Sequence, residues 1–215
     1  MRYNSYAVFG LGKFGQAVAD KLIESDADVM VVDNDEEIIE DYSSRVSVAA
    51  ATDLTDADNI KALGISNVDC AIVCMGMNLE ASIMCVMVAK ESGVKHVVAK
   101  AGSARMGSVL EKIGADEIVY PEEESGFRTA RRLVSSGFLE FYELDDDICI
   151  VELQPRKEWI GKSLKQLDLR KKYGVNVISL NQGKIKGSVD PDEIITETTT
   201  LLVMMNKKTL SKFQN

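Results

Sequence analysis

Three glycines directly after a short apolar segment constrain this chain more than any other feature. Residues 6–9 are largely apolar, Gly10, Gly12 and Gly15 follow, and residues 16–25 have the pattern of a helix. In such a strand-to-helix turn, Gly10 permits the tight turn, Gly12 lets a phosphate approach the backbone and Gly15 lets the helix pack on the strand. Free amides at the helix start favour an anion. The pattern predicts a phosphate-binding loop; the alternative is a glycine-rich turn that serves packing alone.

A carboxylate follows at the place where such folds bind a ribose. Residues 29–32 form a second apolar segment, which leads directly into Asp33, eighteen residues after Gly15. Folds with this loop place an acidic side chain near this point, where it accepts hydrogen bonds from the ribose hydroxyls. No arginine follows Asp33 directly, which favours a free ribose 2′-hydroxyl over the 2′-phosphate of NADP. The sequence therefore predicts a nucleotide site.

Apolar segments alternate with helical patterns through the first part of the chain. Strands are expected at residues 6–9, 29–32, 46–51, 69–75, 96–99 and 117–120. Helices are expected at residues 16–25, 35–42, 57–63, 79–92, 103–113 and 123–136, with Gly137 ending the last. This alternation predicts an α/β fold, a doubly wound parallel sheet of the Rossmann type with both faces covered. The nucleotide-binding domain, with its last helix, is expected to span residues 1–138.

The regular alternation of strands and helices ends at about residue 140. Strands are expected at residues 148–153, 175–180 and 200–205, with a turn and a short helix within residues 159–170. We expect residues 139–215 to form a small α+β domain. A core of this size contributes little net stability, so we expect this domain to pair with a second copy of itself.

Composition and charge exclude several classes of protein. Of the 215 residues, 46% are hydrophobic, yet no run approaches the roughly 18 apolar residues of a membrane span. The first strand begins so early that we expect no signal peptide, and hence a cytoplasmic protein. A net charge of −9 disfavours a nucleic-acid surface. One histidine and four cysteines without C-x-x-C spacing disfavour a zinc site.

Ligands of open α/β sheets bind at the carboxyl ends of the strands. Reading those ends along the sequence gives the candidate cofactor-binding residues: Gly10, Leu11, Gly12, Lys13, Phe14, Gly15, Asp33, Asn34, Thr52, Asp53, Met75, Gly76, Asn78, Lys100 and Glu122.

Several of these side chains have two interpretations. Lys13 either adds positive charge to the anion site or is a solvated loop lysine. Thr52 and Asp53 either edge the adenine pocket or cap the next helix. Lys100 follows a buried strand, so its ammonium is expected at the edge of the site. Glu122 either complements a helix dipole or binds a metal ion or a phosphate-linked group.

The predicted sheet carries no recognisable catalytic set. The sole histidine, His96, is expected at the start of a strand, away from the ligand edge, and residues 139–215 contain no Ser/His/Asp set. We therefore expect a protein that binds a nucleotide without transforming it and has no catalytic residues. The alternative is a small NAD-dependent oxidoreductase, which would require a substrate site and a proton-relaying group. The acidic charge disfavours a third reading, a nucleotide-binding repressor.

Taken together, several motifs resemble one family. Residues 7–15, 51–53, 110–116 and 120–123 resemble the N-terminal half of an RCK (KTN) domain, and residues 168–178 resemble its C-terminal half. The chain is similar from end to end to the cytosolic regulatory subunits of Trk/Ktr potassium uptake systems. Its length, that of a single RCK unit, is closer to the Ktr type than to the tandem, double-length Trk type.

The resemblance implies dimers in an octameric ring beneath a potassium-translocating membrane subunit, peripheral to the inner face of the cell membrane. ATP and ADP would set opposite ring shapes, with NAD or NADH as alternative ligands. Phosphates would lie on the loop from Gly10 to Gly15, the ribose on Asp33, and the base near Thr52 and Met75.

Two further roles are implied by the same resemblance. Lys13 would reach a phosphate across the dimer, and Glu122 would bind a divalent cation there. The C-terminal domain resembles those that bind cyclic di-AMP, although residues 181–183, Asn-Gln-Gly, depart from the basic or histidine residues of relatives.

Overall fold

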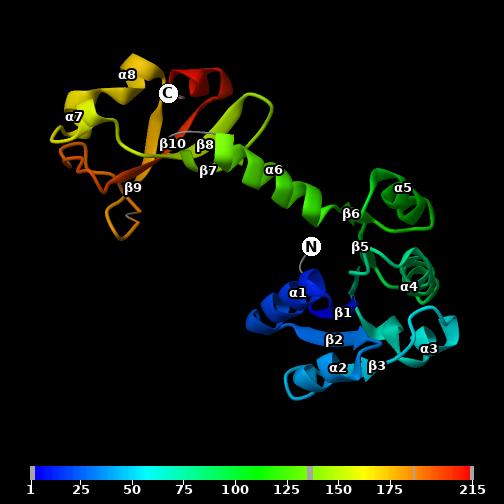
Figure 1. The fold of residues 1–215 in the computed structure, drawn as a ribbon. Helices are drawn as coiled ribbons and strands as arrows, with labels where there is room; N and C mark the ends of the chain where they lie inside the picture. The colour runs from blue at the N-terminus through cyan, green and yellow to red at the C-terminus, as the bar shows by residue number, and fades with distance from the viewer. Residues whose placement is uncertain (1–2, 135–137, 186, 214–215) are drawn as a thin grey trace. The chain divides into compact units, whose positions relative to one another are not determined.

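A six-stranded parallel sheet organises the N-terminal part of the chain (Figure 1). The computed structural model describes residues 3–134, 138–185 and 187–213. Contacts divide the chain after Glu124 into units of residues 1–124 and 125–215. This division falls within one helix, α6 (Pro121–Val134). The domain boundary expected after residue 138 stays a prediction, and the helix end expected at Gly137 lies outside the described residues.

The N-terminal sheet has the strand order β3-β2-β1-β4-β5-β6. Its strands are β1 (Ser5–Phe9), β2 (Asp28–Asp33), β3 (Val48–Ala51), β4 (Cys70–Val73), β5 (His96–Lys100) and β6 (Glu117–Val119). The helices are α1 (Lys13–Glu24), α2 (Glu36–Tyr42), α3 (Ala57–Ala62), α4 (Leu79–Glu91) and α5 (Ala104–Lys112), with a 3-10 turn at Ile65–Asn67. The order reverses between β1 and β4, and the crevice at such a reversal is where doubly wound folds bind ligands. The predicted fold class is confirmed.

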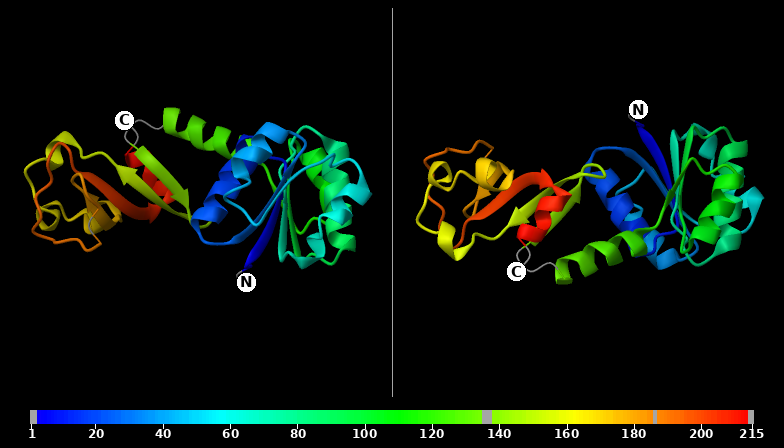
Figure 2. Two further views of the ribbon diagram at one scale, coloured as in Figure 1. Left: turned by 90° about the horizontal axis from the view of Figure 1, so that it is seen from below. Right: turned by 90° about the horizontal axis from the view of Figure 1, so that it is seen from above.

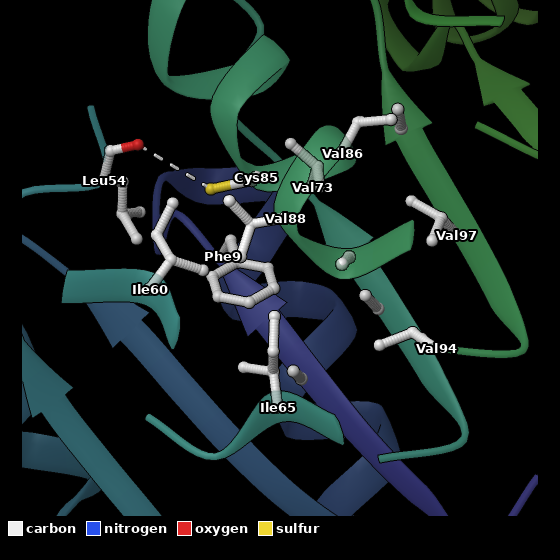
Figure 3. Packing of buried hydrophobic residues seen from close by; sticks show 14 of the residues in the cluster. Phe9, Leu54, Ile60, Ile65, Val73, Cys85, Val86, Val88, Val94 and Val97 are labelled. Atoms are coloured by element: carbon white, nitrogen blue, oxygen red, sulfur yellow. Dashed lines mark hydrogen bonds between the residues drawn. The ribbon is translucent and has the colours of Figure 1, made fainter. Parts of the chain in front are cut away.

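Two hydrophobic clusters sandwich this sheet, because alternate residues of each buried strand face opposite sides. Phe9 packs with residues of α3 and α4, whereas Val8 packs with residues of α1 and α2. Both views in Figure 2 show the blue helices and the cyan-to-green helices on opposite sides of the sheet. Figure 3 shows Phe9 among Ile60, Ile65 and Val88, all of them buried.

Helices α2 to α5 each begin with a side chain that accepts a backbone hydrogen bond. Asp35 caps α2, Asp56 caps α3, Asn78 caps α4 and Ser103 caps α5. Such caps satisfy amides that a helix start leaves without an intrahelical partner. The helix α1 differs, because its N-cap is Gly12, which has no side chain to accept one.

The C-terminal unit contains an antiparallel four-stranded sheet of order β7-β8-β10-β9. Its elements are β7 (Phe138–Glu143), β8 (Ile148–Leu153), α7 (Leu164–Leu167), α8 (Leu169–Tyr173), β9 (Asn176–Asn181) and β10 (Thr200–Asn206), with 3-10 turns at Lys157–Trp159 and Lys207–Lys212. One face of β8 and β10 packs on Trp159, Val175 and Phe213. The sequence missed β7, but the expected α+β character is confirmed. Among the described residues, no helix is long and apolar enough to cross a membrane.

Candidate functional site

The loop after β1 is shaped by two glycines that admit no side chain. Gly10 has φ +87°, and a Cβ there would lie 2.7 Å from the Met75 Sδ. A Cβ on Gly15 would lie 1.9 Å from the Gly10 carbonyl oxygen. The backbone therefore turns tightly from β1 into α1, as the glycine spacing predicts.

Gly12 is a glycine for a different reason. A Cβ placed on Gly12 would meet nothing within 4 Å, so this position faces open space. Gly12 is also the N-cap of α1, where no side chain occupies the amides of the first turn. Those amides and the helix dipole favour an anion, and the missing side chain leaves room for it to approach. Lys13, the first residue of α1, is exposed beside this space.

Asp33, at the end of β2, is tied to the same loop. Its Oδ2 accepts a hydrogen bond from the Leu11 amide at 2.5 Å, and its Oδ1 accepts one from the Asp35 amide at 3.0 Å. Each carboxylate oxygen can accept more than one hydrogen bond. The half-buried carboxylate can therefore still accept from ligand hydroxyls while it holds the loop. Asn34, the next residue, is exposed.

Thr52 and Asp53 lie at the end of β3, beside β2. The Thr52 amide donates to the Asp33 carbonyl at 2.9 Å. The Asp53 carboxylate accepts from the backbone amide and the hydroxyl of Thr55, and these bonds lower the pKa of Asp53. Asp53 thus closes the turn before α3, while Asp56 is the N-cap of that helix. The alternative in which Asp53 itself caps α3 is wrong.

The segment after β4 lies beside the loop that follows β1, because β4 pairs with β1 in the sheet. The Asn78 side chain accepts from the Ala81 amide at 3.1 Å, so it is engaged as the cap of α4. The buried Ser82 hydroxyl oxygen lies 2.7 and 2.8 Å from the carbonyl oxygens of Met75 and Asn78, which share its one proton, and so fixes this segment. Sequence reasoning missed Ser82, whose signal was a lone hydroxyl within the mostly apolar helix α4.

Gly76, next to Met75, is confined from two sides. A Cβ on Gly76 would lie 2.8 Å from the Lys100 Cε and 3.1 Å from its Nζ. From the other side, a Cβ on Gly102 would lie 3.0 Å from the Gly76 carbonyl oxygen. Gly102 was also missed by sequence reasoning; its signal was a glycine two residues after the end of a strand.

Lys100 and Glu122 form an ion pair at the ends of β5 and β6. The Lys100 Nζ lies 2.6 Å from the Glu122 Oε1 and 5.7 Å from the centre of the Phe14 ring. The Lys100 side chain is 13% exposed, whereas that of Glu122 is 70% exposed. The Lys100 hydrogen bond lowers the pKa of Glu122. The sequence placed both residues at this edge, and the structure shows them in contact.

The part of the chain that the structure describes contains no group of three or more His, Cys, Asp or Glu side chains arranged to hold a metal ion. Glu122 brings one carboxylate to the edge of the site. Burial raises the pKa of the Cys74 thiol, beside the loop, to about 12, which disfavours a reactive thiolate there. His96 begins β5, at the opposite edge of the sheet, near Asp116 and Glu117.

Both halves of the chain match known family models. The TrkA-N domain model matches residues 6–121, and the TrkA-C domain model matches residues 149–215. This chain belongs to the TrkA (RCK) family. It is 36% identical to the Ktr system potassium uptake protein C of Bacillus subtilis (strain 168), over 97% of this chain and 95% of that relative. It is 33% identical to the Ktr system potassium uptake protein A of the same organism, over 100% of this chain and 97% of that relative.

Solved RCK structures share the fold. The GsuK RCK domain superposes with a TM-score of 0.68 at 15% identity, covering 100% of this chain and 47% of that one. The GsuK channel bound to NAD gives 0.65 at 16% identity, covering 99% of this chain and 39% of that one. This RCK chain therefore spans less than half of those longer chains. The resemblance to the Ktr-type RCK family is confirmed.

Proposed function

We propose that this chain is the nucleotide-sensing regulatory subunit of a potassium uptake system. The observation that carries the proposal is the start of α1, where the N-cap Gly12 offers no side-chain hydrogen bond and faces open space, and where Asp33 holds the loop. We infer that this arrangement binds a phosphate and a ribose of one ligand. The full-length similarity to two Ktr system potassium uptake proteins supports potassium transport as the process it serves.

We propose ATP and ADP as the ligands, with NAD or NADH as the alternative. Both classes offer a ribose to Asp33 and a pyrophosphate to the amides above Gly12. The likeness to Ktr proteins favours ATP and ADP, while a solved channel of the same fold is described as bound to NAD. The ligand's base would lie near Thr52 and Met75, at the ends of β3 and β4.

Regulation, rather than catalysis, is the role that we assign to the site. Its polar groups bind and orient: backbone amides, the Asp33 carboxylate and the Lys100 ammonium. A bound nucleotide shifts the protein between two shapes only to the extent that it binds one of them better. A small NAD-dependent oxidoreductase is the competing function, and it requires hydride transfer to some substrate.

We further propose that the protein works as an assembly below a potassium-translocating membrane subunit, on its cytoplasmic side. If dimers assembled into an octameric ring, a conformational change in the nucleotide-binding domains could be transmitted through the ring to the membrane subunit. A divalent cation at Glu122 would need oxygen ligands from nucleotide phosphates or a second copy, since Glu122 supplies one carboxylate. Binding of cyclic di-AMP to the C-terminal domain stays a prediction.

One preparation of the protein tests both the identity of the bound nucleotide and the prediction that the protein catalyses no hydride transfer. Mass spectrometry of the nucleotide that co-purifies with the full chain should identify an adenine nucleotide. The purified protein with NADH and a panel of carbonyl substrates should show no hydride transfer, whereas turnover with any of them would favour the oxidoreductase. Light scattering should show a dimer or larger, and a monomer throughout the micromolar range would contradict the assembly.

A further inference from the structure

We propose that Lys100 exchanges its partner when the site fills: it neutralises Glu122 in the ligand-free chain and turns to a nucleotide phosphate in the loaded one, which frees the first turn of α6. This proposal rests on the proposed function, because it requires that a nucleotide bind at the loop.

Lys100 is held in a largely buried position at the end of β5. Its side chain is 13% exposed and lies against Gly76, with its Nζ 5.7 Å from the Phe14 ring centre. Phe14 belongs to the first turn of α1, the turn whose amides face the proposed phosphate site. An ammonium so far removed from water needs an anionic partner nearby. Lys100 is therefore a fixed positive charge at the edge of the site.

Glu122 is the anionic partner of Lys100 in the ligand-free chain. Its side chain is 70% exposed, so water solvates the carboxylate well even without Lys100. The pair, 2.6 Å between Nζ and Oε1, thus matters more to Lys100 than to Glu122. A nucleotide phosphate carries more negative charge than one carboxylate, and the two anions repel each other. When a phosphate binds, we therefore expect Lys100 to leave Glu122 for the phosphate rather than to contact both anions.

Met75 and Gly76 connect the glycine loop with the Lys100 side chain. The Met75 Sδ occupies the space beside Gly10, where a Cβ would come within 2.7 Å of it. Gly76 follows Met75 in the chain and touches the end of the Lys100 side chain, with the Gly102 position close to its carbonyl. A ligand that displaces the Met75 side chain therefore reaches Lys100 through one intervening residue.

The exchange of partners has a consequence for α6, which follows β6 in Figure 1. Glu122 is the second residue of α6, and Pro121 is the first. The pair with Lys100 fastens this first turn to the end of β5. Release of Glu122 removes that attachment at the start of the helix that continues into residues 125–134. Lys100 is thus a positioning residue for α6 as well as a phosphate partner.

The test measures nucleotide affinity and the hydrogen exchange of α6 on the full-length protein, with EDTA present to remove divalent cations. The variants are Glu122→Gln and Lys100→Met, with Glu123→Gln as the matched control, because it removes an adjacent exposed carboxylate of the same turn. ADP and ATP are titrated by calorimetry, with adenosine as the ligand without phosphate. Exchange is followed on peptides that cover residues 119–126.

If the proposal holds, Glu122→Gln binds ADP about threefold tighter than wild type or better, since Lys100 no longer has a competing partner. Lys100→Met binds ADP about tenfold more weakly, while its affinity for adenosine is unchanged. Wild-type exchange at residues 119–126 rises when ADP binds. Glu122→Gln exchanges fast there without nucleotide, and Glu123→Gln behaves as wild type in both measurements.

Three results overturn the proposal and can be told apart. Unchanged or weaker ADP binding by Glu122→Gln, with wild-type binding intact, rejects the exchange of partners and spares the proposed function. Absence of ADP, ATP and NADH binding by the wild type rejects the proposed function and this inference with it. Equal exchange rates in ligand-free wild type and Glu122→Gln reject the attachment of α6 whichever way the affinities fall.

Discussion

The Asp33 carboxylate accepts a hydrogen bond from the Leu11 backbone amide at 2.5 Å. One side chain at the end of β2 therefore holds the loop that follows β1, at the point where the strand order reverses. A nucleotide bound there would meet a loop already set in place, which reduces the conformational entropy lost on binding. Asp33 holds the loop, and we propose that it also accepts hydrogen bonds from the ribose.

Asp33→Ala should weaken ADP binding by about 1–3 kcal/mol, because it removes a charged acceptor from the ribose hydroxyls. Calorimetry with ADP and 2′-deoxy-ADP checks this. Wild type should prefer ADP, and the variant should lose that preference. Asp41→Asn, an exposed change on α2, serves as the control. Equal binding of both ligands by wild type would show that Asp33 does not contact the ribose 2′-hydroxyl.

Gly12→Val should abolish the close approach of a phosphate while leaving the fold intact. The new side chain meets no protein atom within 4 Å of its Cβ, so it would occupy the space proposed for the ligand. We expect ADP affinity to fall at least tenfold, which is about 1.4 kcal/mol. Calorimetry gives the affinity, and circular dichroism checks that α1 still forms. If the folded variant bound ADP as tightly as the wild type, the phosphate would not bind at Gly12.

Gly15→Ala should destabilise the N-terminal unit even without ligand. Its Cβ would lie 1.9 Å from the Gly10 carbonyl oxygen, a backbone atom that cannot rotate away. Forcing α1 from β1 should lower the free energy of unfolding by about 1–3 kcal/mol in urea titrations. Gly126→Ala, where a Cβ meets nothing within 4 Å, is the matched control and should be neutral or slightly stabilising. Equal stability of the two variants would refute this packing argument.

The pair of Lys95 and Asp69 predicts a pH dependence of stability. The Lys95 ammonium, 2.6 Å from the Asp69 Oδ1, and the Asn4 amide lower the pKa of Asp69 from 3.8 to about 2. A lowered carboxyl pKa stabilises the fold above the unfolded value and loses that contribution as the pH falls through the folded one. Asp69→Asn should therefore be less stable than wild type at neutral pH.

Urea titrations between pH 7 and pH 2 check this dependence. The difference between wild type and Asp69→Asn should stay constant down to about pH 4 and shrink between about pH 4 and pH 2. Asp41→Asn should follow the wild type across the series. A difference for Asp69→Asn that is the same at every pH would mean that its cause is not the charge.

The sequence predicted the features that depend on local pattern. Glycine spacing located the loop, and the end of an apolar segment located Asp33, because turns and strand ends depend on neighbouring residues. The hydrogen bond from the Leu11 amide to Asp33 was not predicted. The start of α6 was placed at residue 123, but the helix begins at Pro121, since proline is well suited to a first helical position. The strand β7 was missed because nothing in a short segment such as Phe138–Glu143 shows which strand it will pair with.

Pairings between distant residues could not be predicted in the same way. Lys100 and Glu122 were both placed at the ligand edge, yet their ion pair depends on the side-chain directions at the ends of β5 and β6. The roles of Ser82 and Gly102 depend on backbone that comes close only in the folded chain. Asn78 was assigned to the ligand, while its side chain caps α4. Local hydrogen bonds of this kind compete with ligand contacts for the same polar group.

Small-angle scattering of the full chain loaded with ATP and with ADP tests the central claim most directly. A regulatory subunit must convert the identity of its nucleotide into a difference of shape, and it can do so only through unequal affinities of the two shapes. The account predicts distinct scattering profiles for the two loaded forms, with both nucleotides recovered chemically unchanged. Identical profiles at saturating ATP and ADP would contradict it.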